Sequence, residues 1–151
     1  MSIFHGFNTS ASALTAQRLR MDVISSNIAN AQTTRATIDE DGNYVPYQRK
    51  LVVFEPNEKS FQSFLHKAQQ RQQSPGQGVR VSRIIESTEP FKLVFDPTHP
   101  DANEDGYVQL PNVDPLKEMV DLMSATRAYE ANITSLNATK GMLMKALEIG
   151  K

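Results

Sequence analysis

The strongest candidate for chemistry is a cluster of oxygen-bearing side chains in the second half of the chain. Asp101, Asn103 and Asp105 alternate along the sequence and are followed by Gly106, which matches the first half of a calcium-binding EF-hand loop. The twelfth position of such a loop should supply a bidentate Glu, but here it is Asn112. A turn between two strands favours the same residue types for conformational reasons. Two interpretations therefore stay open: a β-turn, or a soluble calcium-responsive binding module that uses Asp101 to Gly106.

No other set of residues has the spacing of a catalytic or metal site. The three histidines, His5, His66 and His99, lie far apart and form none of the usual ligand patterns. The chain has no cysteine, which excludes a disulfide framework, a thiolate zinc site and a Cys nucleophile. We therefore predict a protein that is not an enzyme, with no catalytic residues, no metal and no cofactor.

The charge balance also narrows the range of partners. The 151 residues include 16 basic and 17 acidic side chains, for a net charge of -1, so we expect no nucleic-acid partner.

The sequence contains no run of 18 apolar residues that could cross a bilayer. Its first residues lack the basic-then-apolar pattern of a cleaved signal peptide. We expect that the chain either stays inside the cell or leaves it without cleavage.

The distribution of proline indicates where helices can form. All eight prolines lie between Pro46 and Pro115, and proline interrupts helices because it lacks an N–H and clashes with the preceding turn. Both ends of the chain can therefore be long helices. The first is predicted from about residue 3 to about residue 29, where Asn27 and Asn30 favour its end. Its residues at alternating steps of three and four form the N-terminal seam, a narrow apolar stripe: Phe4, Phe7, Ala11, Leu14, Arg18, Met21, Ser25 and Ile28.

The second helix has a clearer start. Asp114 is a good N-cap and Pro115 suits the first helical position, so the helix is predicted from there to Ile149. Its residues at the same spacing form the C-terminal seam: Met119, Leu122, Thr126, Tyr129, Ile133, Leu136, Lys140, Leu143 and Leu147.

The residues between the helices are predicted to form strands. Alternating patterns rich in β-forming residues occur at residues 44–55, 79–85, 91–95 and 107–110. We predict an α+β fold in which long, coiled-coil-like terminal helices pack together and a small central β region of hairpins is inserted between them. The expected divisions are an N-terminal helix of the helical core domain (1–33), a central β-rich region (34–113) with a Gln-rich loop (58–78), and a C-terminal helix of the same core (114–151).

Two apolar seams at opposite ends of the chain need to be covered. An intramolecular helical hairpin beside a small β domain is one solution. Further apolar residues off the C-terminal seam, including Val120, Met123, Met142 and Ile149, exceed what two helices can cover and favour partner helices from other chains. The predicted assembly interface consists of Phe7, Leu14, Met21, Asn27, Ile28, Asn30, Leu122, Tyr129, Asn132, Ile133, Leu136 and Leu143.

Four segments resemble one known family. They are SSNIANAQTT at 25–34, PFKLVFDP at 90–97, GYV with LPNV at 106–113, and SATRAYEAN at 124–132. The chain resembles the bacterial flagellar rod and hook family over nearly its whole length. Thr34 and Arg35 replace the Gly-containing continuation of distal rod and hook proteins, so the resemblance is greatest to proximal rod subunits. The departure is the long Gln-rich loop.

The resemblance implies a structural subunit of the flagellar basal body, with a role in cell motility. Its terminal helices would assemble into a tubular drive shaft around the export channel. The implied partners are other rod subunits, copies of the chain itself, the membrane ring or export gate at the base, and the flagellar type III export apparatus, which would export it without signal-peptide cleavage. The resemblance implies no small-molecule substrate. Another rod or hook-junction axial protein is the alternative within the family.

Overall fold

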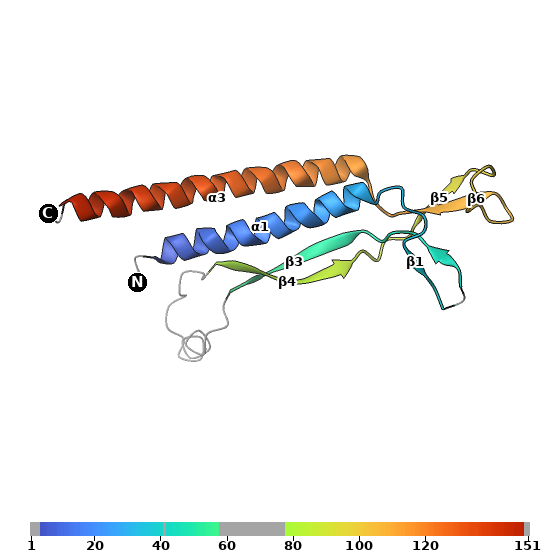
Figure 1. Cartoon of the computed structure of the whole chain (residues 1–151), viewed down its shortest axis with the longest axis horizontal. Helices are drawn as coiled ribbons and strands as arrows, with labels where there is room; N and C mark the ends of the chain where they lie inside the picture. The colour runs from blue at the N-terminus through green and yellow to red at the C-terminus, as the bar shows by residue number, and fades with distance from the viewer. Residues whose placement is uncertain (1–3, 41, 58–77, 150–151) are drawn as a thin grey trace. The chain divides into compact units, whose positions relative to one another are not determined.

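A computed structural model of the chain describes residues 4–40, 42–57 and 78–149 (Figure 1). The Gln-rich loop, except Gly78, and His66 lie outside the described residues. The elements, in chain order, are α1 (His5–Ala29), β1 (Thr37–Ile38), β2 (Tyr44–Val45), β3 (Lys50–Pro56), β4 (Val79–Glu86), β5 (Lys92–Phe95), β6 (Tyr107–Leu110) and α3 (Pro115–Ile149). The predicted α+β class, with a helix at each end and small antiparallel strand pairs between them, is confirmed.

The predicted start of α3 and the predicted end of α1 are both confirmed. At the start of α3, the backbone N–H of Leu116 donates to Asp114 Oδ1 at 3.1 Å, which confirms Asp114 as the N-cap. At the end of α1, Asn30 donates both its backbone N–H, at 3.1 Å, and its side-chain Nδ2, at 2.9 Å, to the Ser26 carbonyl. With 25 and 35 residues, the helices are about 37 and 52 Å long at 1.5 Å per residue.

The single strand predicted over residues 44–55 is wrong in its centre. The structure contains β2 at Tyr44–Val45 and β3 at Lys50–Pro56, separated by an irregular segment. Pro46 has no N–H to donate to a strand ladder, and the Tyr47 N–H donates to the Thr33 carbonyl at 3.0 Å instead. The short strand β1, which pairs antiparallel with β2, was not predicted from the sequence.

The other predicted strands are confirmed with small shifts at their ends. The pair β3–β4 has its ends marked by two backbone hydrogen bonds, Asn57 N–H to the Gly78 carbonyl at 3.0 Å and Ser87 N–H to the Arg49 carbonyl at 2.8 Å. Residue numbers rise along β3 as they fall along β4 between these two hydrogen bonds, so the pair is antiparallel. The hairpin β5–β6 is antiparallel with Phe95 opposite Tyr107.

The chain divides into two compact units, each of which contains parts of both helices. Unit 1 comprises residues 1–19, 53–83 and 125–151, and unit 2 comprises residues 20–52 and 84–124. In unit 1, α1 approaches the start of β4 closely at Gly78, whose φ is +95° and where an added Cβ would lie 2.3 Å from Ser12 Oγ. The glycine is therefore required both by its backbone conformation and by the contact.

In unit 2, the end of α1 and the start of α3 run antiparallel. Arg20 contacts Asp121 and Asn27 contacts Glu118, so residue numbers rise along α1 as they fall along α3. The buried hydrophobic residues of unit 2 are Val23, Ile24, Tyr47, Val108 and Val113.

The buried face of α1 differs from the predicted N-terminal seam. Ala16, Val23, Ile24 and Asn27 are buried, whereas Phe7, Leu14, Met21 and Ile28 are only half-buried. The reason is that α1 has strands as well as a helix to pack against, which moves the centre of burial away from a two-helix stripe. None of the helices in the described part of the chain is long and apolar enough to span a bilayer.

Candidate functional site

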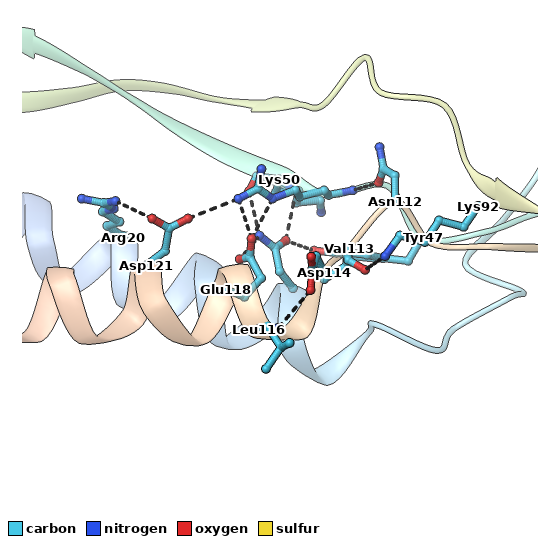
Figure 2. A network of polar contacts seen from close by, with 12 residues as sticks. Arg20, Tyr47, Lys50, Lys92, Asn112, Val113, Asp114, Leu116, Glu118 and Asp121 are labelled. Carbon is cyan, nitrogen blue, oxygen red and sulfur yellow. Dashed lines mark hydrogen bonds and ion pairs between the residues drawn. The ribbon is translucent and has the colours of Figure 1, made fainter.

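A buried polar network lies in unit 2 where α1, β3 and α3 meet (Figure 2). We call Asn27, Tyr47, Arg49, Asn112 and Glu118 the polar clasp. All five side chains are at least nine-tenths buried, and Glu118 is not exposed at all. Because buried polar groups are costly unless they are paired, the hydrogen bonds of the clasp determine what it can do.

Asn27, near the end of α1, uses all of its hydrogen-bonding capacity. Its amide nitrogen donates to the Lys50 carbonyl at 2.9 Å and to Glu118 Oε2 at 3.0 Å. Its amide oxygen accepts from the Lys50 N–H and from the Tyr47 hydroxyl, each at 3.0 Å. An asparagine offers two donors and two acceptor sites, so only a side chain with this amide geometry can join α1 to both β3 and α3.

The second part of the clasp is a buried ion pair. Arg49 Nε donates to Glu118 Oε1 at 2.7 Å, and an Arg49 terminal nitrogen contacts the same oxygen at 2.5 Å. Glu118 Oε2 accepts from Asn27, so both carboxylate oxygens have partners. Such a pair contributes little net stability when intact but is costly to break, because the remaining charge stays buried.

The clasp extends to the segment that precedes α3 and to the surface. Asn112 Oδ1 accepts from the Arg49 N–H at 2.7 Å, and Asn112 Nδ2 donates to the Glu89 carbonyl at 2.8 Å. On the other side, Asp121 lies between Arg49 and Arg20 with contacts of 3.4 Å to each (Figure 2). The network therefore holds one end of each terminal helix and the start of β3 in a fixed arrangement.

The chemistry of the clasp is structural. Arg49 and Glu118 face each other as opposite charges, and both Glu118 carboxylate oxygens have hydrogen-bond partners. Among the described residues, no group of three or more His, Asp or Glu could hold a metal ion. What this arrangement can do is fix the relative position of two helices.

The calcium interpretation of residues 101–106 receives no support from the structure. Arg35 Nε donates to Asp101 Oδ1 at 2.7 Å, and the Thr34 hydroxyl donates to Asp101 Oδ2 at 2.8 Å. Both carboxylate oxygens are thus occupied, and a guanidinium stands where a cation would bind. Asn103 Oδ1 accepts the Tyr107 N–H at 2.7 Å, as expected for a β-turn. These hydrogen bonds, led by that from Arg35, lower the pKa of Asp101 and raise that of Arg35.

The predicted interface residues fall into different environments. Asn27 bonds to the other terminal helix, whereas Asn30 and Asn132 bond to carbonyls of their own helices. Ile133 is exposed. The remaining eight are half-buried: Phe7, Leu14, Met21, Ile28, Leu122, Tyr129, Leu136 and Leu143.

No sequence pattern identifies Tyr47, Arg49, Asn112 and Glu118 as a connected group. Glu118 was noticeable only as an acidic residue in the first turn of α3. A carboxylate on the buried side of a helix requires a cationic partner, and this signal could have prompted a search for an arginine. It could not have selected Arg49 from the 16 basic residues.

The outer surface of α3 is unusually apolar. Leu116, Met119, Val120 and Met123 are exposed near its start, and Met142, Met144, Leu147 and Ile149 near its end. Contiguous exposed apolar surface on a helix indicates a site of association.

Family models match both terminal regions. The model described as flagella basal body rod protein matches residues 7–37, and the model described as flagellar basal body rod FlgEFG protein C-terminal matches residues 104–149. The first covers most of α1 and the second includes all of α3.

Three curated proteins are similar along their whole length, and each is named flagellar basal-body rod protein FlgC. The protein from Bacillus subtilis is 62% identical over 151 residues, which is 100% of both chains. The protein from Borreliella burgdorferi is 44% identical over 154 residues, which covers 99% of this chain and 98% of that one. The protein from Salmonella typhimurium is 42% identical over 154 residues and 100% of both chains.

Proposed function

The chain belongs to the flagellar basal-body rod protein family, and we propose that its two terminal helices are the segments through which it joins the rod. It is a structural subunit of the proximal rod and is located in the flagellar basal body. Its partners are other rod components.

The observation that carries the proposal is the exposed apolar surface of α3. Its last two turns contain Met144, Leu147 and Ile149, which are between 55% and 85% exposed. A helix that is apolar on several sides is stable in water only when neighbours cover it. In a tubular assembly, helices of adjacent subunits supply that cover through heterologous contacts.

The proposed interface includes the twelve residues predicted from the sequence, extended by the exposed residues at the end of α3. Half-buried side chains such as Leu136 and Leu143 still present part of their surface to a neighbour. We also propose the division into a helical core, residues 1–33 and 114–151, and a central β-rich region, residues 34–113. In this division the polar clasp aligns the two core helices with the β-rich region.

The remaining partners follow from membership of the family. We propose contacts with copies of the same chain and with the membrane ring or export gate at the base. We also propose passage through the flagellar type III export apparatus without cleavage, and a role without enzymatic activity.

The proposal is tested by replacing exposed apolar residues at the end of α3. Met142→Glu with Leu147→Glu should leave the fold of the chain intact, because both side chains are exposed. Incorporation into purified basal bodies should fall about a hundredfold, since each large side chain contributes about 1.5 to 3 kcal/mol when buried. The measurement is the amount of tagged chain in basal bodies relative to the amount in the cell.

The matched control is Thr134→Glu with Asn137→Glu, which adds the same charge at exposed polar positions of the same helix. Normal incorporation of the Met142 and Leu147 variant would contradict the proposal. If the native tagged chain were absent from basal bodies, the location of the protein itself would be contradicted.

A further inference from the structure

Two exposed surfaces of unit 2 complement each other but do not cover each other within one chain. The first is the hairpin face, formed by Leu93, Phe95 and Tyr107 of β5–β6. The second is the α3 stripe, formed by Leu116, Met119, Val120 and Met123. All seven side chains are between 44% and 75% exposed.

The hairpin face is a preformed apolar surface. Leu93, Phe95 and Tyr107 lie on the same side of the hairpin, because side chains alternate along a strand and Phe95 is paired with Tyr107. The two rings pack edge to face with their centroids 5.3 Å apart. Behind them, a Cβ at Gly106 would lie only 3.0 Å from the Phe95 ring. The rings are therefore held in place without a partner.

The α3 stripe lies on the side of the helix away from the polar clasp. Its residues recur at steps of three, one and three, which places them on one face, whereas Glu118 and Ala125 are completely buried on another. Methionine is well suited to packing against aromatic rings because its thioether is flexible and polarisable. The stripe offers two methionines to two rings of the hairpin face.

The charges around the two surfaces are opposite. The loop between β5 and β6 carries Glu104 and Asp105, both exposed, and the α3 stripe is flanked by exposed Lys117 and Arg127. None of these four residues has an ion-pair partner within the described ranges 4–40, 42–57 and 78–149. Two hairpin faces brought together would repel, and so would two α3 stripes, but one of each attracts.

We propose that the hairpin face of one copy of this chain docks on the α3 stripe of the next copy. This inference rests on the proposed function, in which identical subunits are added one after another. Such addition requires two different, mutually complementary surfaces on the same chain. The hairpin face and the α3 stripe meet that requirement in apolar character and in charge.

Cysteine crosslinking tests the contact directly, because the native chain has no cysteine to give a background. A full-length chain with Leu93→Cys and Val120→Cys is expressed, and oxidation is carried out in isolated basal bodies. Head-to-tail docking predicts a ladder of covalent dimers, trimers and longer products on a non-reducing gel. Each single variant should give no ladder and no dimer.

The matched control pairs Leu93→Cys with Ser135→Cys, an exposed position of α3 outside the stripe, and should give no ladder. An equal ladder from this control, dimers from a single variant, or no ladder from incorporated Leu93→Cys, Val120→Cys chains would overturn the inference. In the last case the proposed function would stand, because the chain would still be in the basal body.

A charge exchange provides a second measurement if the cysteine variant is not incorporated. Lys117→Glu with Arg127→Glu should lower incorporation about tenfold, whereas Lys140→Glu, elsewhere on α3, should not. Adding Glu104→Lys and Asp105→Lys to the same chain should restore incorporation. Native incorporation of the Lys117→Glu, Arg127→Glu chain would contradict the docking. So would a failure of Glu104→Lys and Asp105→Lys to restore incorporation.

Discussion

At the scale of single residues, Asn27 shows why an amide occupies the end of α1. Its two donors and two acceptor sites meet a carbonyl, a carboxylate, an N–H and a hydroxyl. Aspartate has the same shape but lacks both donors. The identity of this residue is therefore determined by partners on β3 and α3, which are distant in sequence.

We expect Asn27→Asp to destabilise the chain by about 3 kcal/mol or more, because it removes two buried hydrogen bonds and places a second carboxylate against Glu118. The measurement is the urea midpoint of unfolding, monitored by circular dichroism. Asn30→Asp is the matched control, since the Asn30 amide nitrogen bonds to a carbonyl of its own helix. Adding Glu118→Gln to Asn27→Asp should recover part of the loss by restoring a donor. Equal midpoints for the two single variants would show that the clasp does not contribute.

We expect the Asp101 carboxylate to make the stability of the chain depend on pH in the acid range. The Arg35 and Thr34 hydrogen bonds lower its pKa in the folded chain, so the unfolded chain binds the proton more readily than the folded one. The stability from this interaction is therefore fully present above the ordinary pKa of about 3.9. It is lost as the pH falls through the lower, folded value.

Asp101→Asn should abolish this acid dependence, because the amide does not titrate. We expect the difference in unfolding midpoint between the native chain and the variant to be largest at pH 6 and to shrink below about pH 4. Urea titrations at a series of pH values measure it. Asp105→Asn, an exposed neighbour, is the control. A difference that stays constant down to pH 2 would rule out the ion pair as its cause.

At the scale of elements, α3 is held unevenly along its length. Its first part contributes Glu118 and Ala125, both completely buried. From residue 134 to residue 149 the helix has only half-buried and exposed side chains. Helices depend mainly on tertiary packing for their stability, so the second part should open more readily in the isolated chain.

Hydrogen exchange measures this difference. In the monomeric full-length chain, amides of residues 134–149 should exchange at least about tenfold faster than those of residues 119–128. In isolated rods the two segments should be similarly protected, because neighbouring subunits cover the second part. Equal protection of both segments in the monomer would mean that the helix needs no assembly partners.

At the scale of the whole molecule, a buried polar network coexists with extensive exposed apolar surface. The polar clasp is buried in unit 2, while many large apolar side chains of α3 and the hairpin β5–β6 are exposed. A buried, fully paired network fixes one arrangement of elements, and exposed apolar surface gains stability only from other chains. This distribution fits a structural subunit that gains stability by assembling with other chains.

Local patterns alone determined the larger elements of this protein. The proline distribution, the Asp114 cap and the steps of three and four were enough to place both helices, because helix periodicity and capping depend on residues a few positions apart. The same patterns located four strands, and short segments such as SSNIANAQTT indicated the family. The break at Pro46 was a local signal that the sequence analysis underestimated.

Only the tertiary structure decided which side chains meet. Asn27 and Glu118 are 91 residues apart, and Thr34 and Asp101 are 67 apart. Such contacts depend on how complete elements pack, and no short-range pattern specifies them. For the same reason the buried face of α1 was displaced from the predicted seam, since it depends on β3 and α3 together, and the calcium-like turn proved to be an anchor for Arg35.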